Sequence, residues 1–369
     1  MTLDDILDKD PFSLPNSSKE AILLPIVREA TVWHFKHSKE FKNICAMHNF
    51  DPFASFSISD LPFLPVSLFK KFELLSVPKN EIVKTLYSSS TSGHPSKIFL
   101  DKTTANSQIK ALSKILTDYF GKDRRYFIVF DNEDTLKSTD GSLSSRNTAI
   151  RGILGLAKKV DFILDKNLRI DLKKLKRVAN NLSQGDRICF FGFTWLVHNV
   201  CNDPLKDFQI KKIFKDIKST NKLFLHIGGW KKLQDLNVSK SGFNKLVGDF
   251  TNVKVKKIVD FYGMTEQLGT VYPDCSEGFK HVPLYSDIII RDITTTESLA
   301  KGKAGLIQFV SPIAHSYPGI SILSDDIGRI VGVDDCECGR MGKYFVFEKR
   351  AEFAELRGCG DTLDIKNES

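Results

Sequence analysis

The feature that most constrains the fold is a regular alternation of short apolar runs and longer amphipathic stretches, from about residue 83 to about residue 280. Short apolar runs are typical of buried strands, and apolar residues at helical spacing are typical of helices. Strands and helices in alternation predict an α/β fold. We expect strands at 126–130, 160–164, 187–191, 223–229 and 257–262, and helices at 105–120, 152–157 and 172–182.

The parts of the chain on either side of this core differ from it. Residues 1–82 combine a helical pattern with a proline-punctuated connection, so we expect a helical N-terminal segment of one large domain. After the α/β core at 83–280, residues 281–345 have patterns typical of strands, and they predict a smaller β-rich subdomain. The last segment, 346–369, is expected to be a shortened hinge and a tail.

The composition narrows the class of protein. With 41% hydrophobic and 27% charged residues, the chain of 369 residues has a globular composition. Its most apolar run, 188–197, is too short to span a membrane, and its acidic N-terminus lacks the pattern of a secretory signal. We therefore expect a cytoplasmic protein without a membrane span. The seven cysteines favour thiol or metal chemistry over a disulfide scaffold, because they are an odd number in a long chain.

The formal net charge of +8 raises the alternative of a nucleic-acid-binding protein. Such a protein would gather basic clusters and stacking aromatic side chains on one surface. Here the basic residues occur in short bursts with apolar residues between them, as at 173–177, which is typical of solvated helix faces. The charge pattern therefore argues against a nucleic-acid partner.

A hydroxyl-rich loop separates two apolar segments at residues 87–97. Hydroxyl and backbone N–H groups on a glycine-hinged loop can surround negative oxygens, and a lysine at its end adds positive charge. The alternative is a flexible serine-glycine turn that binds nothing. The candidate phosphate-binding residues are Ser88, Ser89, Ser90, Thr91, Ser92, Gly93 and Lys97.

Four separated segments, taken in order, resemble the adenylate-forming enzyme superfamily, whose members activate carboxylic acids with ATP. The serine loop ends in Pro95-Ser-Lys97, similar to the superfamily's phosphate loop, and residues 228–230 read Gly-Gly-Trp. Two further segments, Phe261-Tyr-Gly-Met-Thr-Glu266 and Ser324-Asp-Asp-Ile-Gly-Arg329, are similar to its Tyr-Gly-x-Thr-Glu and Thr-Gly-Asp-x-Gly-Arg motifs. The order matters, because any one short motif can occur by chance.

This resemblance implies a large adenylate-forming domain with two sheet subdomains, packed helices and a smaller β-rich subdomain, in which 83–280 binds ATP. It also implies Mg²⁺, held by Glu266, with Thr265 at the α-phosphate and Lys97 supplying positive charge where two anions meet. The implied adenine contacts are Gly228, Gly229 and Trp230 beside the ring and Tyr262 stacked on it, with Gly263 and Met264 in the same loop as Tyr262. The implied ribose contacts are Asp326, which we choose over Asp325, and Arg350 as a second contact.

Within the superfamily the chain is similar to the LuxE-type acyl-protein synthetases of bacterial bioluminescence. The similarity rests on the segments 61–70, 262–269 and 356–360. It implies that the acyl group of a fatty acid passes from acyl-AMP to Cys359, and from there to a partner protein, either a thioester reductase or a transferase. Since only a short segment follows Phe347, the superfamily's mobile C-terminal domain is expected to be largely absent.

Two points stay open at this level. The first is the alternative of an enzyme with the same fold that uses coenzyme A, as phenylacetate ligases do. The second is the acyl pocket, for which the aromatic run 190–195 is a candidate, although aromatic strands are more often plain core.

A second group of residues suggests a metal. Cys275 and His281 form a C-x5-H pair, and Cys336 and Cys338 form a C-x-C pair followed by a glycine. Three thiolates and one imidazole make a suitable tetrahedral set for a structural Zn²⁺. The alternative is that these are ordinary buried or surface cysteines, since C-x-C is less specific than C-x-x-C.

Overall fold

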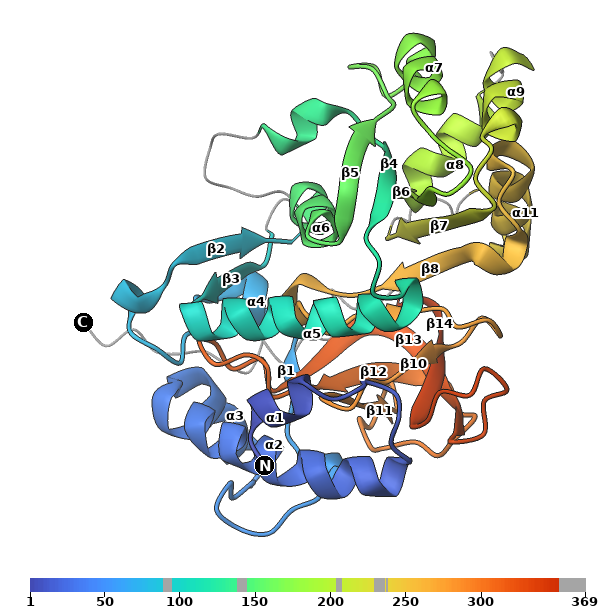
Figure 1. The fold of residues 1–369 in the computed structure, drawn as a ribbon. Helices are drawn as coiled ribbons and strands as arrows, with labels where there is room; N and C mark the ends of the chain where they lie inside the picture. The colour runs from blue at the N-terminus through green and yellow to red at the C-terminus, as the bar shows by residue number, and fades with distance from the viewer. Residues whose placement is uncertain (89–94, 138–144, 204–207, 229–235, 237, 352–369) are drawn as a thin grey trace. The chain divides into compact units, whose positions relative to one another are not determined.

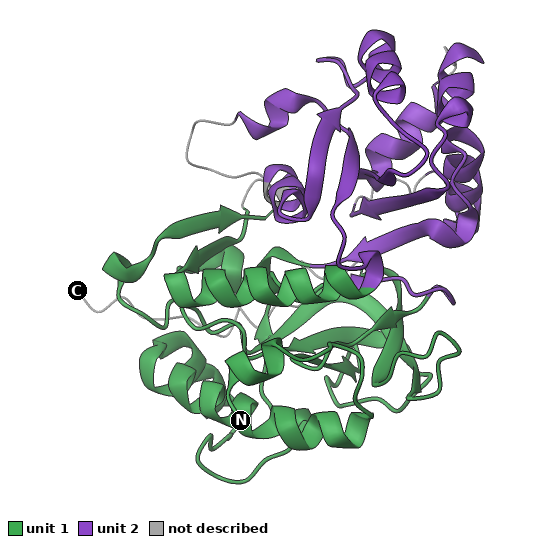
Figure 2. Cartoon of the chain, viewed as in Figure 1, with its two compact units in different colours: residues 1–118, 264–271, 279–369 green, residues 119–263, 272–278 purple. Residues whose placement is uncertain are grey.

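The computed structural model describes residues 1–88, 95–137, 145–203, 208–228, 236 and 238–351. The chain divides by packing into two compact units, which Figure 2 shows in two colours. Unit 1 comprises residues 1–118, 264–271 and 279–369, and unit 2 comprises residues 119–263 and 272–278. The bounds of these packing units differ from those of the segments expected from the sequence, which are 1–82, 83–280, 281–345 and 346–369. The division into those functional segments stays a prediction.

Unit 2 is built on a six-stranded sheet. Its strands, in spatial order, are β5 (Ala157–Phe162), β4 (Arg125–Phe130), β6 (Arg187–Phe193), β7 (Asn221–Ile227), β8 (Ile258–Tyr262) and β9 (Tyr272–Pro273). The first five run parallel, and β9 is antiparallel to β8. The alternation read from the sequence thus corresponds to a parallel sheet with helical crossovers.

The helices α7 (Leu172–Asn180), α8 (Thr194–Asn202), α9 (Phe208–Asp216) and α11 (Lys240–Thr251) share one apolar core with this sheet (Figure 1). Along β4, alternate residues face that core, because strand side chains alternate between the two faces. At its centre the Phe130 ring lies 5.3 Å from that of Phe224, and the Phe190 ring lies 5.7 Å from that of Phe214. Each buried phenylalanine contributes about 1.5–3 kcal/mol of transfer free energy. Among the residues that the structure describes, unit 2 also contains the helical segments α6 (Ser145–Leu154), η3 (Glu133–Leu136) and η4 (Val255–Lys257).

Unit 1 contains a second six-stranded sheet. Five of its strands lie in the order β10 (Lys280–His281), β14 (Lys343–Arg350), β13 (Ser321–Val333), β12 (Gly305–Val310) and β11 (Asp287–Arg291), all antiparallel to their neighbours. The sixth, β1 (Leu64–Pro65), is parallel to β13. A separate two-stranded hairpin pairs β2 (Lys84–Tyr87) with β3 (Lys97–Leu100).

The helices of unit 1 include α2 (Asn16–His37) and α3 (Lys39–Met47), which pack on one another (Figure 1). The long helix α5 (Lys102–Phe120) follows β3 directly and accepts a hydrogen bond of 2.7 Å at the Ala111 carbonyl from the Tyr285 hydroxyl. The described part of unit 1 also contains the helical segments α1 (Leu3–Leu7), η1 (Ile58–Asp60), α4 (Leu68–Lys71), η2 (Lys79–Glu81) and η5 (Thr265–Gln267).

One element expected from the sequence is wrong. Residues 152–157 do not form a helix of their own, because α6 ends at Leu154 and β5 begins at Ala157. Gly155 lies in the gap between them, where a residue of low helix propensity favours the end of a helix. The apolar residues keep a helical spacing across this junction, so the sequence pattern did not indicate the change from helix to strand.

The long apolar run at 188–197 divides between a strand and a helix, since β6 ends at Phe193 and α8 begins at Thr194. Gly192 permits this tight packing, because a Cβ there would lie 2.5 Å from a Val197 methyl and 2.9 Å from the Phe130 Cβ. In the described part of the chain, no helix combines the length and apolarity that crossing a membrane requires.

The fold of unit 1 also buries a histidine. His34 on α2 is 0% exposed, and its ring is hydrogen-bonded to the Ser76 hydroxyl at 2.8 Å and to the Ala314 carbonyl at 3.0 Å. Burial lowers the pKa of His34 to about 3. Because the unfolded chain takes up a proton near pH 6.5 and the folded protein does not, the free energy of unfolding must fall as the pH drops below about 6.5.

We therefore expect His34 to contribute a loss of about 2 kcal/mol in the free energy of unfolding between pH 7.5 and pH 5. The measurement is the urea midpoint of the wild-type protein and of His34→Gln at both pH values. The variant should lose less stability on acidification, whereas His37→Gln, on the exposed side of the same helix, should behave as the wild type. Equal pH slopes in His34→Gln and the wild type would contradict this account.

Candidate active site

The ends of the serine loop are held together in unit 1. In the β2–β3 hairpin, Tyr87 pairs with Lys97. Just beyond it, the Ser88 N–H donates to the Ser96 carbonyl at 3.1 Å, and the Ser96 N–H donates to the Ser88 hydroxyl at 2.8 Å. Lys97 is exposed at the first position of β3. The other predicted phosphate contacts, Ser89, Ser90, Thr91, Ser92 and Gly93, lie outside the described residues.

Glu266 is a buried carboxylate beside this loop. It is 5% exposed, and burial raises its pKa, an effect that the Ser96 hydroxyl and the charge of Lys70 offset in part. In the described part of the chain, no lysine or arginine forms an ion pair with Glu266. A buried carboxylate of this kind is costly unless a cation approaches it. The structure thus brings Glu266 to the Ser96 end of the serine loop.

Two other predicted residues, from the segment 261–266 that carries Glu266, are described in unit 1. Met264 directly precedes the short helix η5, and Thr265 is its first residue. Both side chains are half-buried.

The predicted ribose contacts lie on the paired strands β13 and β14. Asp326 is directly opposite Arg350 in the register of these strands. The Arg350 guanidinium, however, pairs with the neighbouring carboxylate of Asp325, with Nη2 and Oδ2 3.2 Å apart. The negative charge of Asp325 also raises the pKa of Glu266, which places this strand pair close to the buried carboxylate.

In unit 2 the predicted adenine contacts lie at one edge of the parallel sheet. Gly228 directly follows β7, Tyr262 ends β8 and Gly263 comes next, and the pairing of Ile227 with Phe261 sets the two strand ends side by side. The carboxyl edge of a parallel sheet is where α/β folds usually bind ligands. Gly228 has a φ of +57°, and a Cβ there would meet no atom within 4 Å. Gly229 and Trp230 lie outside the described residues.

A buried histidine at the same edge was not predicted from the sequence. His226 is 0% exposed, hydrogen-bonded through Nδ1 to the Thr194 hydroxyl at 2.9 Å, and 3.8 Å from the Asp260 carboxylate. His226 and Asp260 are direct neighbours in the pairing of β7 with β8. A polar residue inside each of two apolar strands was the signal that could have indicated them. The contact joins the start of α8 to the carboxyl end of β7.

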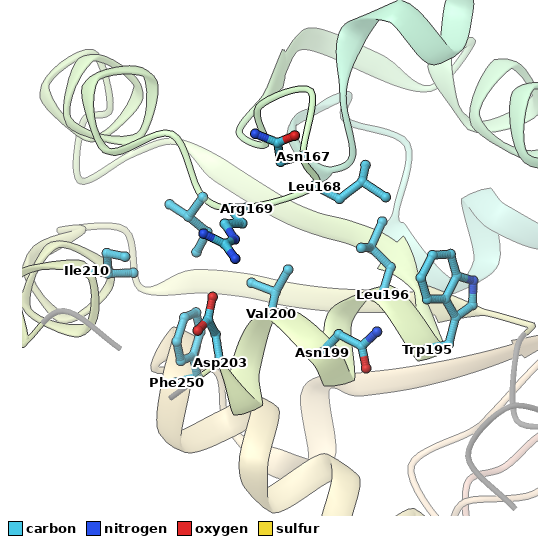
Figure 3. A pocket seen from close by; sticks show the side chains of 11 residues that line it. Asn167, Leu168, Arg169, Trp195, Leu196, Asn199, Val200, Asp203, Ile210 and Phe250 are labelled. Carbon is cyan, nitrogen blue, oxygen red and sulfur yellow. The ribbon is translucent and has the colours of Figure 1, made fainter. Parts of the chain in front are cut away.

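A cavity of ≈ 410 Å³ lies along α8 in unit 2 (Figure 3). Leu196 and Val200 are buried in its wall, with Trp195 at one end and Ile210 and Phe250 at the other. Exposed polar side chains line its rim: Asn167, Arg169 and Asn199. Within the aromatic run 190–195 predicted to line an acyl pocket, Phe190 belongs to the plain core, and Trp195 lines the cavity.

The four residues predicted to bind zinc come together. The ligand atoms of Cys275, His281, Cys336 and Cys338 all lie within 4.8 Å of one another. His281 on β10 is 0% exposed, with Nε2 3.2 Å from the Cys338 sulfur. Burial lowers the pKa of His281 to about 4, which leaves its imidazole neutral and able to bind a metal at neutral pH. Three thiols and an imidazole are the donors that a tetrahedral zinc site uses.

The predicted acyl acceptor, Cys359, lies outside the described residues. The structure describes the start of its segment, where the Ala351 N–H donates to the Asp325 carbonyl at 2.8 Å.

Solved structures of 2-hydroxyisobutyryl-CoA ligase have a similar fold. The enzyme in the postadenylation state with 2-HIB-AMP matches with a TM-score of 0.66 at 13% identity, covering 90% of this chain and 67% of that chain. An open conformation of the same ligase, with 2-HIB-AMP and CoA, also matches with a TM-score of 0.66 at 13% identity, covering 92% and 76%. The fold is therefore that of the adenylate-forming ligases, as the sequence motifs predicted.

A family model described as acyl-protein synthetase, LuxE, matches residues 1–367. The chain thus belongs to the acyl-protein synthetase (LuxE) family, and it is an enzyme of the ligase class. It is 25% identical over 318 residues to the long-chain-fatty-acid–luciferin-component ligase of Aliivibrio fischeri, covering 83% of this chain and 78% of that one. The corresponding ligase of Vibrio harveyi is 24% identical over 340 residues, with coverage of 90% and 85%.

The burial of Glu266 gives a prediction about stability. A carboxyl group whose pKa is raised by folding destabilises the protein above that pKa, and the cost disappears below its ordinary value of 4.5. Glu266→Gln should therefore raise the free energy of unfolding at pH 7 by about 0.5–2 kcal/mol, as single stabilising substitutions commonly do. Urea unfolding at pH 7 and pH 4 measures this difference, which should vanish at the lower pH. Glu297→Gln, on an exposed turn, is the control that should change neither value.

Proposed function

We propose that the enzyme joins a fatty acid to ATP to form acyl-AMP and pyrophosphate, and then transfers the acyl group to its own Cys359. The observation that carries the proposal is the buried Glu266 carboxylate beside the Ser88–Ser96 pairing, in a chain of the acyl-protein synthetase family. Pairing a metal-binding carboxylate with a phosphate-binding loop suits a site for a triphosphate.

In the first step a carboxylate oxygen of the acid attacks the α-phosphorus of ATP, and pyrophosphate leaves with the electron pair of the broken bond. Two anions must approach each other, so the site has to supply positive charge and hydrogen-bond donors. Lys97 and the serine loop supply these, and Thr265 binds the α-phosphate. Glu266 would hold Mg²⁺, which when bound neutralises charge on the phosphate oxygens.

The nucleotide's other contacts belong to the strand ends. Tyr262 stacks on the adenine, and the backbone at Gly228, which is open to close approach, lies beside it. Asp326 accepts hydrogen bonds from the ribose hydroxyls. Arg350, opposite Asp326 in the strand register and paired with Asp325, is the second ribose contact.

In the second step the Cys359 thiolate attacks the carbonyl carbon of acyl-AMP. A carbon–sulfur bond forms, the carbon–oxygen bond to phosphate breaks, and AMP leaves as an anion. The reaction suits a thiolate, which is a strong nucleophile. The thioester then delivers the acyl group to a partner protein, either a reductase that makes an aldehyde or a transferase.

The family and the cavity along α8 support the proposed substrate class. The two relatives are named as long-chain-fatty-acid ligases. We infer that the buried apolar wall formed by Leu196, Val200 and Phe250 receives the hydrocarbon chain. The Trp195 end of the cavity lies next to the carboxyl edge of β6, and β6 is the direct neighbour of β7, which ends before Gly228. An acid bound with its tail along α8 would present its carboxylate at this edge.

The cysteine and histidine group is proposed to hold a structural Zn²⁺. His281, Cys336 and Cys338 belong to β10 and to the turn between β13 and β14, and Cys275 completes the four donors. When bound, Zn²⁺ would cross-link this turn to β10 at the edge of the sheet.

The central test is intact mass spectrometry after incubation with ATP, Mg²⁺ and a series of saturated fatty acids of increasing length. The wild-type protein should gain the mass of one acid minus one water. Cys359→Ala should lose this adduct but still release pyrophosphate, whereas Cys45→Ala, which removes a buried thiol on α3, should keep it. Formation of free acyl-CoA without a protein adduct would support the coenzyme A alternative instead.

Zinc can be tested separately by metal analysis of the purified protein. We expect about one Zn²⁺ per chain, lost in Cys338→Ser together with several degrees of thermal stability, because structural zinc contributes directly to folding. Cys189→Ser, at a buried position on β6 outside the group, is the control that should retain the metal. A wild-type protein free of zinc after expression in zinc-supplemented medium would disprove the site.

A further inference from the structure

The loop that carries Glu266 is attached to unit 1 by buried hydrogen bonds that the proposed chemistry does not use. The Tyr317 hydroxyl donates to the Glu266 carbonyl at 2.9 Å. The Gln267 side-chain amide donates to two further carbonyls, those of Phe309 at 3.1 Å and Gly319 at 3.2 Å. Tyr317 and Gln267 are 1% and 5% exposed, so water does not compete for these bonds.

The segment that supplies Tyr317 is itself fixed to the strand that starts at Lys97. The Ser316 hydroxyl donates to the Phe99 carbonyl of β3 at 2.7 Å, and the Ser316 N–H donates to the Thr104 hydroxyl of α5 at 3.0 Å. The Tyr317 ring packs edge-on against Phe69, with centroids 6.1 Å apart. One short segment, residues 316–319, therefore contacts both β3 and the Glu266 loop.

The same loop is confined from the side of α5. Gly269 has a φ of +91°, and a Cβ there would lie 2.6 Å from the Gln108 Cα. Gln108 also donates to the Tyr317 hydroxyl at 3.4 Å.

We infer that Tyr317 and Gln267 are positioning residues, which hold the Glu266 carboxylate at the fixed place relative to β3 that binding of the metal–ATP complex requires. The inference rests on the proposed function, because it assigns the cation to Glu266. Neither residue touches the substrate: Tyr317 acts through the backbone of Glu266, and Gln267 acts through the turn that follows it. Removing a residue that orients a metal ligand typically lowers metal affinity by about 10–100-fold, even though that residue does not touch the metal.

The test uses Tyr317→Phe in the full chain, with Tyr285→Phe as a matched control. Both variants remove one buried tyrosine hydroxyl that donates to a backbone carbonyl in unit 1, but the Tyr285 partner is Ala111 on α5. Binding of Mn²⁺ in the presence of ATP is measured by electron paramagnetic resonance, and the acid-dependent exchange of pyrophosphate into ATP is measured as a function of Mg²⁺ concentration.

Tyr317→Phe should weaken Mn²⁺ binding about 10-fold and raise the Mg²⁺ concentration for half-maximal exchange by a similar factor. Tyr285→Phe should leave both values unchanged, although each variant loses some stability. Equal effects in the two variants would overturn the positioning role and leave the proposed function intact. Absence of any acid-dependent exchange in the wild-type protein would overturn both.

A second variant approaches the loop from the opposite side. Gly269→Ala places a methyl group against the α5 backbone, whereas Gly302→Ala has a similar φ of +86° with no atom within 4 Å of the added carbon. Both substitutions put alanine at a positive φ and so strain the backbone, but only Gly269→Ala also pushes the loop away from α5. A difference between the two variants therefore reports displacement of the loop. We expect the weakened Mn²⁺ binding in Gly269→Ala alone, and normal binding there would contradict the inference.

Discussion

The candidate site depends on keeping the negative charge of Glu266 away from water. Burial makes that charge costly, and the cost is acceptable only if the surrounding segments hold it where a cation can reach it. Those segments come from four parts of the chain: the ends of the serine loop, residues 316–319, helix α5 and strand β12. Segments distant in the sequence of unit 1 thus meet around this one carboxylate.

The sequence predicted the sheet of unit 2 well, because a strand buried on both faces needs a continuous apolar run and β4, β6 and β7 have one. It predicted α6 poorly, because helical spacing ran on past Leu154 into β5. It could not predict the two packing units, since the chain passes between them at residues 119, 264, 272 and 279. Local patterns contain no information about which distant segments pack together.

The same distinction applies to the site. Glu266 and Asp326 could be proposed from the sequence because each lies in a short motif with a particular side chain, and their roles stay predictions. Tyr317 was missed, because it acts on a backbone carbonyl 51 positions away, and any residue can supply a carbonyl. His226 and Asp260 lie between these cases: each is a polar residue in an apolar strand, but only the parallel register of β7 and β8 makes them neighbours.

Under the proposed function, the hydrogen bond between Ala351 and Asp325 limits how far Cys359 can lie from the site. It ties the chain to β13 one position before Asp326, and Cys359 comes eight positions after Ala351. At about 3.6 Å per residue, the fully extended chain can carry that thiol at most about 29 Å from its anchor. A short tether of this kind corresponds to an effective concentration of the order of millimolar. If Cys359 is the acceptor, as proposed, a thiol tethered this closely would react ahead of dilute thiols in solution without any affinity for the acyl group.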